Sequence, residues 1–261
     1  MEVYIRPKNI IVVGGGSGIG YACAQRLLDG GAKNIILASR NLEKLNHAKN
    51  ALRHSAVQGI FTVQLDISKV KSHQSFIAEA QSLIPDCPLD GLVLSGGVNF
   101  DGSNWKGFNV SEEDWDRVMN TNLKGTFFLL RNFANYLFEH KTRGNICVIS
   151  SISAHRDMLS PYQISKSAIS AIVHAFGKFL CERGVVLNCV EPGSTDTDMM
   201  PHLKQYTDGV RPGKIWTDNS IGRVLRPEEI AEIVYFCMTN LGETMSGSCV
   251  LAGGGCKGLH Y

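Results

Sequence analysis

A tyrosine and a lysine stand four residues apart in the segment SPYQISKSAISAIVHAF, residues 160–176. The segment is a predicted helix, so Tyr162 and Lys166 would project from the same face. A phenol has an ordinary pKa of about 10, and a neighbouring ammonium favours its ionised form. Tyr162 could therefore exchange a proton with a hydroxyl or carbonyl group of a substrate. This spacing often occurs by chance, so its value as evidence for a catalytic pair depends on the elements around it.

Two serines close the predicted strand that precedes this helix. The run NICVISS, residues 145–151, ends in Ser150 and Ser151. A hydroxyl at this place can hydrogen-bond a substrate oxygen and hold it near Tyr162. Alternation along the strand leaves open which serine faces the substrate, because a bulge or an early turn reverses the face.

Glycines crowd the segment VVGGGSGIGYACAQRLL, residues 12–28. The apolar run of residues 10–13 predicts a buried strand, and the apolar spacing after the glycines predicts a helix. The unpaired N–H groups at the start of such a helix suit a phosphate, which bare glycines allow to approach closely. The common G-x-G-x-x-G fingerprint is absent, and the spacing is Gly14, Gly18 and Gly20 instead. The cluster predicts a phosphate-binding turn; a glycine-rich turn without a ligand is the alternative.

The residues after the second predicted strand bear on the choice of cofactor. Enzymes that prefer NAD usually place a carboxylate about 20 residues past the glycines, where it binds the ribose hydroxyls. This chain has Ser39, Arg40 and Asn41 there. The planar, always charged guanidinium of Arg40 suits a 2′-phosphate, and the Ser39 hydroxyl can assist. NADP(H) is therefore predicted in preference to NAD(H); alternatively, Arg40 is only the first solvated residue of the next helix.

Strand-like apolar runs alternate with longer helical patterns along the chain. The expected strands cover residues 9–13, 34–39, 60–66, 91–96, 145–151, 185–193 and 248–254, and a well-marked helix covers 226–240. The alternation predicts an α/β Rossmann fold, a doubly wound parallel seven-stranded sheet with helices on both faces. Ligands would bind above the carboxyl ends of the strands. With 261 residues and 44% apolar composition, one domain over residues 1–261 is expected.

The least patterned segment covers residues 199–222 and is polar and rich in turn residues. A loop of this length in a compact domain is often functional, which predicts a substrate lid; a plain insertion is the alternative.

Composition and charge exclude several classes of protein. The formal net charge of +2, with both signs scattered along the chain, leaves no basic stripe for nucleic acid. No apolar run reaches the ~20 residues of a membrane span, and the apolar stretch near the start is a predicted strand rather than part of a signal peptide. The eight cysteines form no C-x-x-C, which predicts reduced thiols, no metal site and a soluble, cytoplasmic protein.

The motifs resemble those of the short-chain dehydrogenase/reductase family, in the same order, over residues 9 to about 255. They are GGGSGIG, LDI, NTNLKGTFF, ISS, YQISK, EPGSTDTDM, RPEEIA and SGSCVLAGGG. The resemblance implies an oxidoreductase that transfers hydride between a nicotinamide and an alcohol or carbonyl group. It implies Ser151, Tyr162 and Lys166 as the catalytic core, with Tyr162 as general acid and base. Asn122 would be the fourth member and hold a water on a proton path; Asn120 is the competing choice, and a helix cap or kink is the alternative role for Asn122.

The same resemblance implies the contacts to the cofactor. They would come from Gly14, Ser17, Gly18, Ile19, Gly20, Ser39, Arg40, Asp66, Ile67, Gly96, Tyr162, Lys166, Pro192, Gly193, Thr195 and Thr197. Lys166 would bind the nicotinamide ribose, while Thr195 and Thr197 would lie near the carboxamide and the diphosphate. Asp66 would lie beside the adenine; an N-cap for the following helix is its alternative role.

Two departures from the family pattern stand out. Where the family usually has N-N-A-G after its fourth strand, this chain has the segment Leu94-Ser95-Gly96-Gly97. The small pair still lets the backbone pass under the cofactor, but the asparagine contacts that brace the sheet are lost. Ser151 and Tyr162 are also only eleven residues apart, fewer than usual, which predicts a shorter loop and a different pocket above it.

The segments SISAH and EPGSTDTDM resemble those of 2,3-dihydro-2,3-dihydroxybenzoate dehydrogenases, which oxidise a cyclic diol with NAD. An NAD-dependent dehydrogenase of a cyclic diol is therefore the alternative function, and a dinucleotide-binding regulator without turnover is a third candidate. Ser151, His155 and Tyr162 would bind the substrate, and Met158 and Trp216 would help to line the pocket. His155 could bind a carboxylate or cap a turn.

The family resemblance also implies a homo-tetramer or a homo-dimer. The packing would use the helices of residues 111–140 and 161–182 together with the C-terminal strand. Apolar residues at positions 127–130 are compatible with such a contact, although burial in the core explains them equally well.

Overall fold

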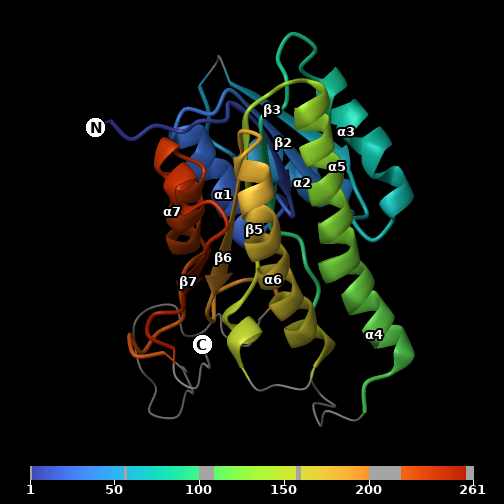
Figure 1. The fold of residues 1–261 in the computed structure, drawn as a ribbon, viewed down its shortest axis with the longest axis vertical. Coiled ribbons are helices and arrows are strands. Elements are labelled where there is room, and N and C mark those ends of the chain that lie inside the picture. The colour runs from blue at the N-terminus through green and yellow to red at the C-terminus, as the bar shows by residue number, and fades with distance from the viewer. Residues whose placement is uncertain (1, 56–57, 100–108, 157–159, 200–218, 257–261) are drawn as a thin grey trace.

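Seven parallel strands form one sheet in the order β3-β2-β1-β4-β5-β6-β7 in the computed structural model of the chain (Figure 1). The structure describes residues 2–55, 58–99, 109–156, 160–199 and 219–256. The strands are β1 (Asn9–Val13), β2 (Asn34–Ser39), β3 (Gly59–Gln64), β4 (Gly91–Leu94), β5 (Gly144–Ile149), β6 (Val185–Pro192) and β7 (Cys249–Ala252). The predicted seven-stranded parallel sheet is confirmed.

The centre of the sheet consists of apolar runs that are buried on both faces. Every residue of β1, β4 and β5 is buried. Alternate side chains of β1 enter two different cores: Ile11 and Val13 lie in one, and Ile10 and Val12 lie in the other. Burial on both sides requires helices on both sides, because a parallel sheet has no face suited to water.

Helices pack against each face of the sheet (Figure 1). One face is covered by α1 (Gly18–Asp29), α2 (Leu42–Ala51) and α7 (Pro227–Cys237). The other face is covered by α3 (His73–Ser82), α5 (Thr126–Glu139) and α6 (Pro161–Cys181). Shorter segments are η1 (Val70–Ser72), α4 (Glu112–Val118), η3 (Met119–Gly125), η4 (Ile152–His155) and η6 (Asn240–Met245). This is the doubly wound, single-domain arrangement that the sequence predicts, and none of the helices described is long and apolar enough to cross a membrane.

Several elements end earlier than the sequence predicts. β4 ends at Leu94 rather than at residue 96, and β5 ends at Ile149 rather than at residue 151. β3, β6 and β7 also stop one or two residues short of the predicted ends. The polar residues that follow leave the strand ladder and turn towards the carboxyl edge of the sheet. The predicted helix 226–240 ends at Cys237, because the Thr239 hydroxyl accepts a hydrogen bond from Leu241 N and starts η6.

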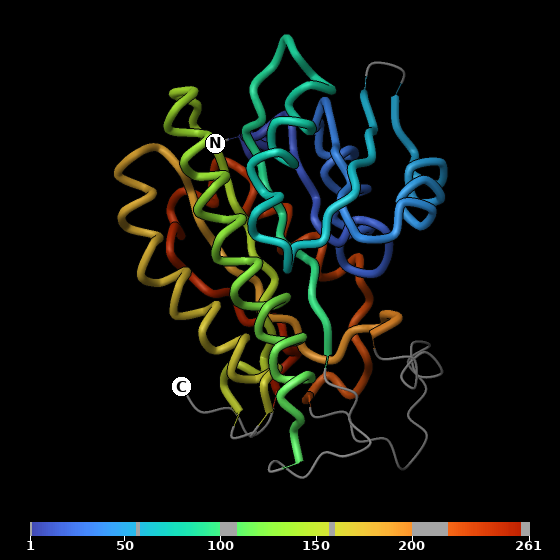
Figure 2. The backbone as a smooth tube through the Cα atoms, turned by 90° about the vertical axis from the view of Figure 1, so that its right-hand side faces the viewer, coloured from blue at the N-terminus to red at the C-terminus, as the bar shows by residue number. Residues whose placement is uncertain are grey.

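The carboxyl edge of the sheet is the place where a ligand is expected. β1 lies between β2 and β4, so the strand order changes direction there. Doubly wound sheets bind ligands outside the strand carboxyl ends at this switch point. The described chain ends that flank residues 100–108, 157–159 and 200–218 also lie at this edge, at the lower end of the molecule in Figures 1 and 2.

Candidate functional site

The first turns of α6 bring Tyr162 and Lys166 to the carboxyl edge. Ser160 caps the helix by accepting a hydrogen bond from Gln163 N, and Pro161 occupies the first turn. Lys166 is buried and donates from Nζ to Ile149 O at 2.9 Å. Its Nζ lies 5.6 Å from the centroid of the Tyr162 ring, so the two side chains share one face as predicted.

Ser151 contacts the tyrosine, whereas Ser150 does not. The Ser151 hydroxyl hydrogen-bonds the Tyr162 hydroxyl and accepts a bond from Ser153 N at 3.1 Å. Ser150 is turned to the other side, where its hydroxyl donates to Lys166 O at 3.0 Å. The extended backbone at Ser151, followed directly by η4, produces this division.

Burial dominates the electrostatics of this cluster. It raises the pKa of Tyr162, and the hydrogen bond with Ser151 offsets only part of that rise. Burial also lowers the pKa of Lys166 to about 8. The expected shift of Tyr162 towards phenolate is therefore absent from the protein alone, because the cost of burying a charged phenolate outweighs the hydrogen bond with Ser151.

Asn122 is the asparagine that faces the cluster, and it lies in the π-helical segment η3 between α4 and α5. The side chain is 2% exposed, whereas Asn120 is half-buried. Asn122 accepts a hydrogen bond from Val98 N at 2.8 Å and donates to Val98 O at 2.8 Å. The wide turn of a π segment is a frequent feature of functional sites. Here it lets one amide side chain pair with the backbone of the segment that follows β4.

This pairing explains how the chain manages without the usual N-N-A-G segment. A Cβ atom added to Gly97 would lie 3.4 Å from Asn122 Oδ1 and 3.7 Å from Lys166 Nζ. Gly97 therefore runs between the amide and the ammonium. Asn122 supplies the brace through Val98, and Gly96 keeps the backbone close to the glycine turn of β1.

The glycine turn has the shape that the sequence predicts. Gly14 has a φ of +80°, and a Cβ atom there would lie 2.8 Å from Gly96 N. A Cβ atom on Gly20 would collide with the Gly14 carbonyl. Helix α1 begins at Gly18, and the Ser17 side chain makes no capping hydrogen bond to it. The first N–H groups, including those of Gly18 and Ile19, thus point out of the helix without an intrahelical partner.

A second segment reaches this turn from β6. Gly193 N donates to Ala252 O at 2.9 Å, and the Thr195 hydroxyl donates to Gly193 O at 2.9 Å. A Cβ atom on Gly18 would lie 3.1 Å from Thr197 Cγ2. The structure therefore brings residues 192–197 close to the start of α1. There, this segment and the first turn of α1 could both contact one diphosphate.

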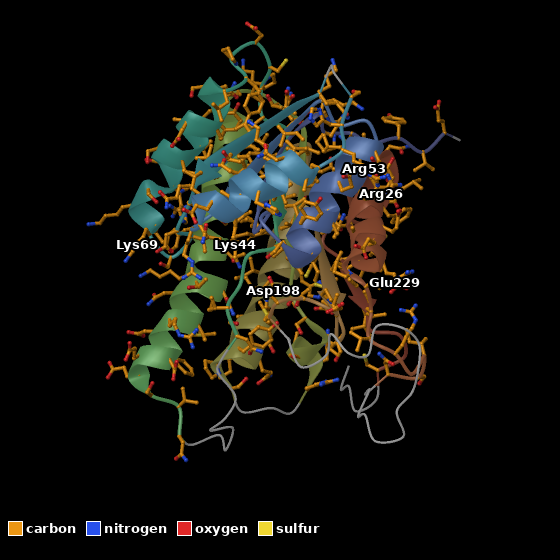
Figure 3. The ribbon with its side chains drawn as sticks, turned by 180° about the vertical axis from the view of Figure 1, so that it is seen from behind. Arg26, Lys44, Arg53, Lys69, Asp198 and Glu229 are labelled. Carbon is orange, nitrogen blue, oxygen red and sulfur yellow. The ribbon has the colours of Figure 1, made fainter. Side chains whose placement is uncertain are left out.

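Basic side chains gather beside the end of β2. Arg40 is exposed and precedes α2, whose N-cap is Asn41 with Lys44 N donating to its side chain at 2.9 Å. Arg40 is therefore not the first residue of the helix. A Cβ atom on Gly16 would lie 3.6 Å from Lys44 Cβ, so the Lys44 stem lies against the glycine turn (Figure 3). The sequence analysis did not identify Lys44. The sequence signal that could have identified it is a basic residue in the first turn of the helix that follows Arg40.

Asp66 lies near these cations. Burial alone would raise the pKa of Asp66, but hydrogen bonds from Ser68 and the charges of Arg40 and Lys69 together lower it below its ordinary value. Its Oδ1 accepts from Ser68 N at 3.0 Å, and the N-cap position of α3 is Ser72. Asp66 therefore closes a local turn, and Ser72 rather than Asp66 is the N-cap of α3, which removes the alternative role that the sequence left open for Asp66. Ile67, directly after it, is buried.

His155 contacts a residue that sequence reasoning missed. Its Nε2 lies 2.7 Å from Glu191 Oε2, and the Ser170 hydroxyl donates to Glu191 Oε1 at 2.6 Å. The carboxylate that His155 binds thus belongs to the protein. A glutamate inside the apolar run VVLNCVEP is the sequence signal for it. Met158, Trp216 and residues 200–218 of the predicted lid lie outside the described residues.

Comparisons with known proteins identify the family. The family model described as short chain dehydrogenase matches residues 8–207. The 2,3-dihydro-2,3-dihydroxybenzoate dehydrogenase of Escherichia coli strain K12 is 28% identical over 257 residues, covering 95% of this chain and 96% of the relative. The diacetyl reductase of Staphylococcus epidermidis that forms (S)-acetoin is 25% identical over 258 residues, covering 95% and 98%.

A solved structure agrees with these matches. A short chain dehydrogenase/reductase family protein superposes with a TM-score of 0.77 and 26% identity, covering 95% of this chain and 96% of that chain. The seven-stranded sheet and the match to most of the chain are consistent with one another. The chain therefore belongs to the short-chain dehydrogenase/reductase family, as an oxidoreductase that acts on alcohol or carbonyl groups.

Proposed function

We propose that the protein is an NADP(H)-dependent oxidoreductase that interconverts a carbonyl and an alcohol, with Tyr162 as the general acid and base. The observation that carries this proposal is the contact of the Ser151 and Tyr162 hydroxyls beside buried Lys166. This cluster lies at the carboxyl edge of the sheet, and Gly97 links it to the segment that packs on the glycine turn.

The residues present fit a dinucleotide. Glycines occupy positions where a Cβ atom would meet Gly96 or Gly14, which leaves the space above the start of α1 to a ligand. The N–H groups of residues 18–20 would hold the diphosphate, and Thr195 and Thr197 would flank it and the carboxamide. Lys166 would bind the nicotinamide ribose. When bound, NADP(H) supplies or accepts the hydride.

The residues of the chain would handle the proton. Ser151 would hydrogen-bond the substrate oxygen and hold it beside Tyr162. In reduction Tyr162 would give its proton to the carbonyl oxygen, and in oxidation it would take the proton of the alcohol. The positive charges of Lys166 and of an oxidised nicotinamide would oppose the effect of burial and favour the phenolate. Asn122 would keep Val98 and Gly97 in place beside Lys166.

The preference for NADP(H) rests on Arg40 and Lys44. Lys44 lies against the glycine turn, Arg40 directly follows β2, and residues 39–41 contain no carboxylate to bind the ribose hydroxyls. Arginine suits a 2′-phosphate because its planar fork binds two oxygens at once. The charge of Arg40 helps to lower the pKa of Asp66, and we propose that Asp66 flanks the adenine.

Titration with NADPH and NADH, followed by fluorescence, tests this preference. We expect NADPH to bind more tightly, and Arg40→Asp to weaken NADPH binding by about tenfold or more, the loss of one hydrogen bond to a charged group. Arg53→Asp is the matched control, because Arg53 is an exposed arginine beyond the other end of α2 (Figure 3). Tighter binding of NADH, or equal effects of the two substitutions, would contradict the preference.

A second candidate is an NAD-dependent dehydrogenase of a cyclic diol. The similarity to the 2,3-dihydro-2,3-dihydroxybenzoate dehydrogenase of Escherichia coli favours it, and Arg40 opposes it. Oxidation of a cyclic diol with NAD, together with a preference for NADH in the titration, would support this alternative over the reductase.

We further propose that residues 199–222 act as a substrate lid and that the protein assembles as a homo-tetramer or homo-dimer in the cytoplasm. The helices proposed for the contact include α5 and α6, where Phe179 of α6 is 49% exposed. Sedimentation measured with and without cofactor tests the assembly.

A further inference from the structure

A buried histidine begins α3, close to the residues proposed to flank the adenine. His73 is the first residue of this helix and is fully buried. Its Nε2 lies 2.9 Å from the carbonyl oxygen of Ile67, the residue directly after Asp66. Burial lowers the pKa of His73 below its ordinary value, and the hydrogen bond with Ile67 offsets only part of that shift. The ring is therefore a neutral imidazole at neutral pH, and only one of its nitrogens carries hydrogen.

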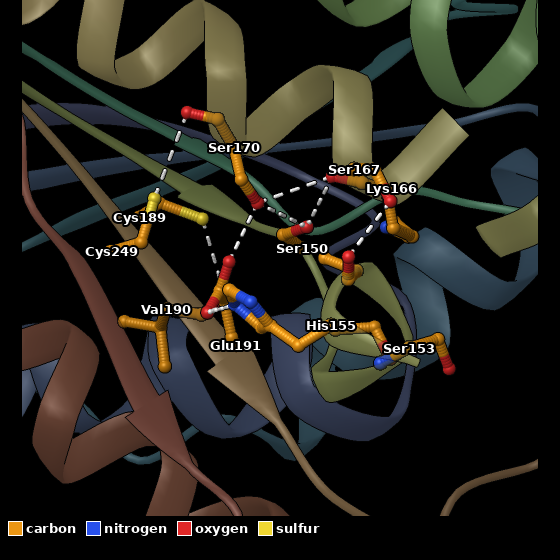
Figure 4. Close-up of polar contacts among 12 residues, drawn as sticks. Ser150, Ser153, His155, Lys166, Ser167, Ser170, Cys189, Val190, Glu191 and Cys249 are labelled. Carbon is orange, nitrogen blue, oxygen red and sulfur yellow. Dashed lines mark hydrogen bonds and ion pairs between the residues drawn. The ribbon is translucent and has the colours of Figure 1, made fainter. Parts of the chain in front are cut away.

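The acceptor determines which nitrogen of His73 carries that hydrogen. A backbone carbonyl can only accept, so Nε2 is the donor to Ile67 O. His155 faces the carboxylate of Glu191 instead, a group that can accept or, when protonated, donate (Figure 4). Nδ1 of His73 is left as a bare acceptor, and it has no hydrogen-bond partner in the described part of the chain. An unpaired buried acceptor is destabilising, so the favourable polar contact of this ring is the bond from Nε2.

The Ile67 carbonyl lies against two elements. The hydrogen bond attaches it to α3, and a Cβ atom on Gly125 would collide with it, so Gly125 of η3 packs directly against it. The same η3 segment carries Asn122, whose amide pairs with Val98 beside the catalytic cluster. This carbonyl is therefore the point at which the segment after β3 meets α3 and η3.

Local hydrogen bonds shape the turn of residues 66–69. Asp66 Oδ1 accepts from Ser68 N at 3.0 Å and from the Ser68 hydroxyl at 2.7 Å. Lys69 N donates to Asp66 O at 3.0 Å. These bonds fix the shape of the turn, but they do not fix its place relative to α3. The bond from His73 does so, because α3 itself is anchored in the core by Phe76 and other apolar residues.

We propose that His73 is a positioning residue for the adenine half of the cofactor site. Its Nε2–H group holds the Ile67 carbonyl and thereby sets the place of Asp66 and Ile67 beside the adenine. The ring is fully buried, so it acts through Ile67. This inference rests on the proposed function, because it takes residues 66–67 as the contact to the adenine.

Two amide substitutions separate the presence of a donor from its place. In His73→Gln the amide nitrogen can take the place of Nε2 and donate to Ile67 O, whereas in His73→Asn the shorter amide reaches only the place of Nδ1. The probes are adenosine 2′,5′-bisphosphate and adenosine 5′-monophosphate, measured by isothermal titration calorimetry. We expect both dissociation constants to stay within about threefold of the wild type in the glutamine variant and to rise by about tenfold or more in the asparagine variant.

Hydrogen–deuterium exchange of the ligand-free protein gives a readout that needs neither cofactor nor turnover. We expect the amides of residues 66–69 to exchange about tenfold faster in His73→Asn and at close to the wild-type rate in His73→Gln. Protection of β1 in the same data shows whether each variant is folded. His73→Leu, which lacks both the donor and the bare acceptor, should match the asparagine variant and replaces it if that variant does not fold.

The controls separate this inference from the proposed function. His47→Asn changes an exposed histidine of α2 and should leave binding and exchange unchanged. Equal affinities of the glutamine and asparagine variants, whether both match the wild type or both are weakened, would overturn the role of His73. Failure of the wild type to bind either probe would instead count against the proposed dinucleotide site, while the exchange of residues 66–69 would still show whether His73 holds the turn.

Discussion

The ion pair of Arg223 and Glu229 lies beside residues 192–197, the segment proposed to contact the cofactor, and its contribution to stability can be measured. Arg223 binds the Glu229 carboxylate with both terminal nitrogens, one at 2.7 Å and one at 2.5 Å. The carboxylate also accepts from Arg226 N at 2.8 Å and so caps α7. Leu225, which follows shortly after Arg223, exchanges backbone hydrogen bonds with Ser194 and Asp196. Loss of the pair therefore loosens the segment that holds residues 192–197.

The pKa of Glu229 sets the magnitude. The hydrogen bond from Arg223 is the largest cause that lowers this pKa from 4.5 to about 2. A fully realised shift of this size would correspond to about 3 kcal/mol of unfolding free energy at neutral pH. The side chains are 33% and 29% exposed, so water screens the pair. We therefore expect Glu229→Gln to lower the unfolding free energy by roughly 1–2 kcal/mol at pH 7.

The direction of the Glu229 pKa shift determines how its stabilisation of the fold changes with pH. A folded-state pKa below the unfolded value means that the stabilisation is present above pH 4.5 and is lost as the pH falls through about 2. Urea denaturation of the wild type and Glu229→Gln at pH 7, 4.5 and 3 should show a difference that shrinks towards acid. Glu228→Gln is the control. Equal losses in the two variants, or a loss that is the same at pH 7 and pH 3, would show that the ionised Glu229 carboxylate does not stabilise the fold through Arg223.

Two further predictions concern the catalytic cluster. Ser151→Ala should lower kcat/KM by about 100-fold, because its hydroxyl contacts Tyr162, whereas Ser150→Ala should cost less than about threefold; the reverse order in steady-state kinetics would be evidence for Ser150 as the substrate contact. Burial lowers the pKa of Lys166 to about 8, so its charge is present below that pH and is lost as the pH rises through it. The dissociation constant of NADPH should rise above about pH 8, and Lys166→Met should remove this dependence; a flat profile in the wild type from pH 6.5 to 9.5 would contradict the assignment.

The sequence predicts the sheet well because strands that are buried on both faces are apolar at successive positions. Runs such as NIIVV, residues 9–13, are apolar at every position, and a strand with this pattern must be covered on both faces. The strand ends are less predictable. Residues 95–96 and 150–151 directly follow apolar runs, and Ser95 N and Ser150 N still donate to Val13 O and Val190 O, but the strand ladder ends at Leu94 and Ile149.

The relative positions of the site residues can be predicted from the sequence only where the residues share one helix or strand, because their spacing then fixes the face on which they lie. Tyr162 and Lys166 share a helix, so their common face follows from their separation. The contact of His155 with Glu191 joins residues that are 36 positions apart, and no local pattern specifies it. The π segment at Asn122 likewise has no periodic signature, because the surrounding residues still read as one continuous helix.

The role of Tyr162 as general acid and base is tested by the effect of Tyr162→Phe on turnover and on cofactor binding, measured on the same preparation. The substitution removes one hydroxyl, the group that we propose transfers the proton. We predict that NADPH-dependent reduction of 2,3-butanedione falls by about 100- to 10,000-fold while the dissociation constant of NADPH changes by less than about threefold. Turnover close to that of the wild type in the phenylalanine variant would contradict the assignment of Tyr162 as the general acid and base.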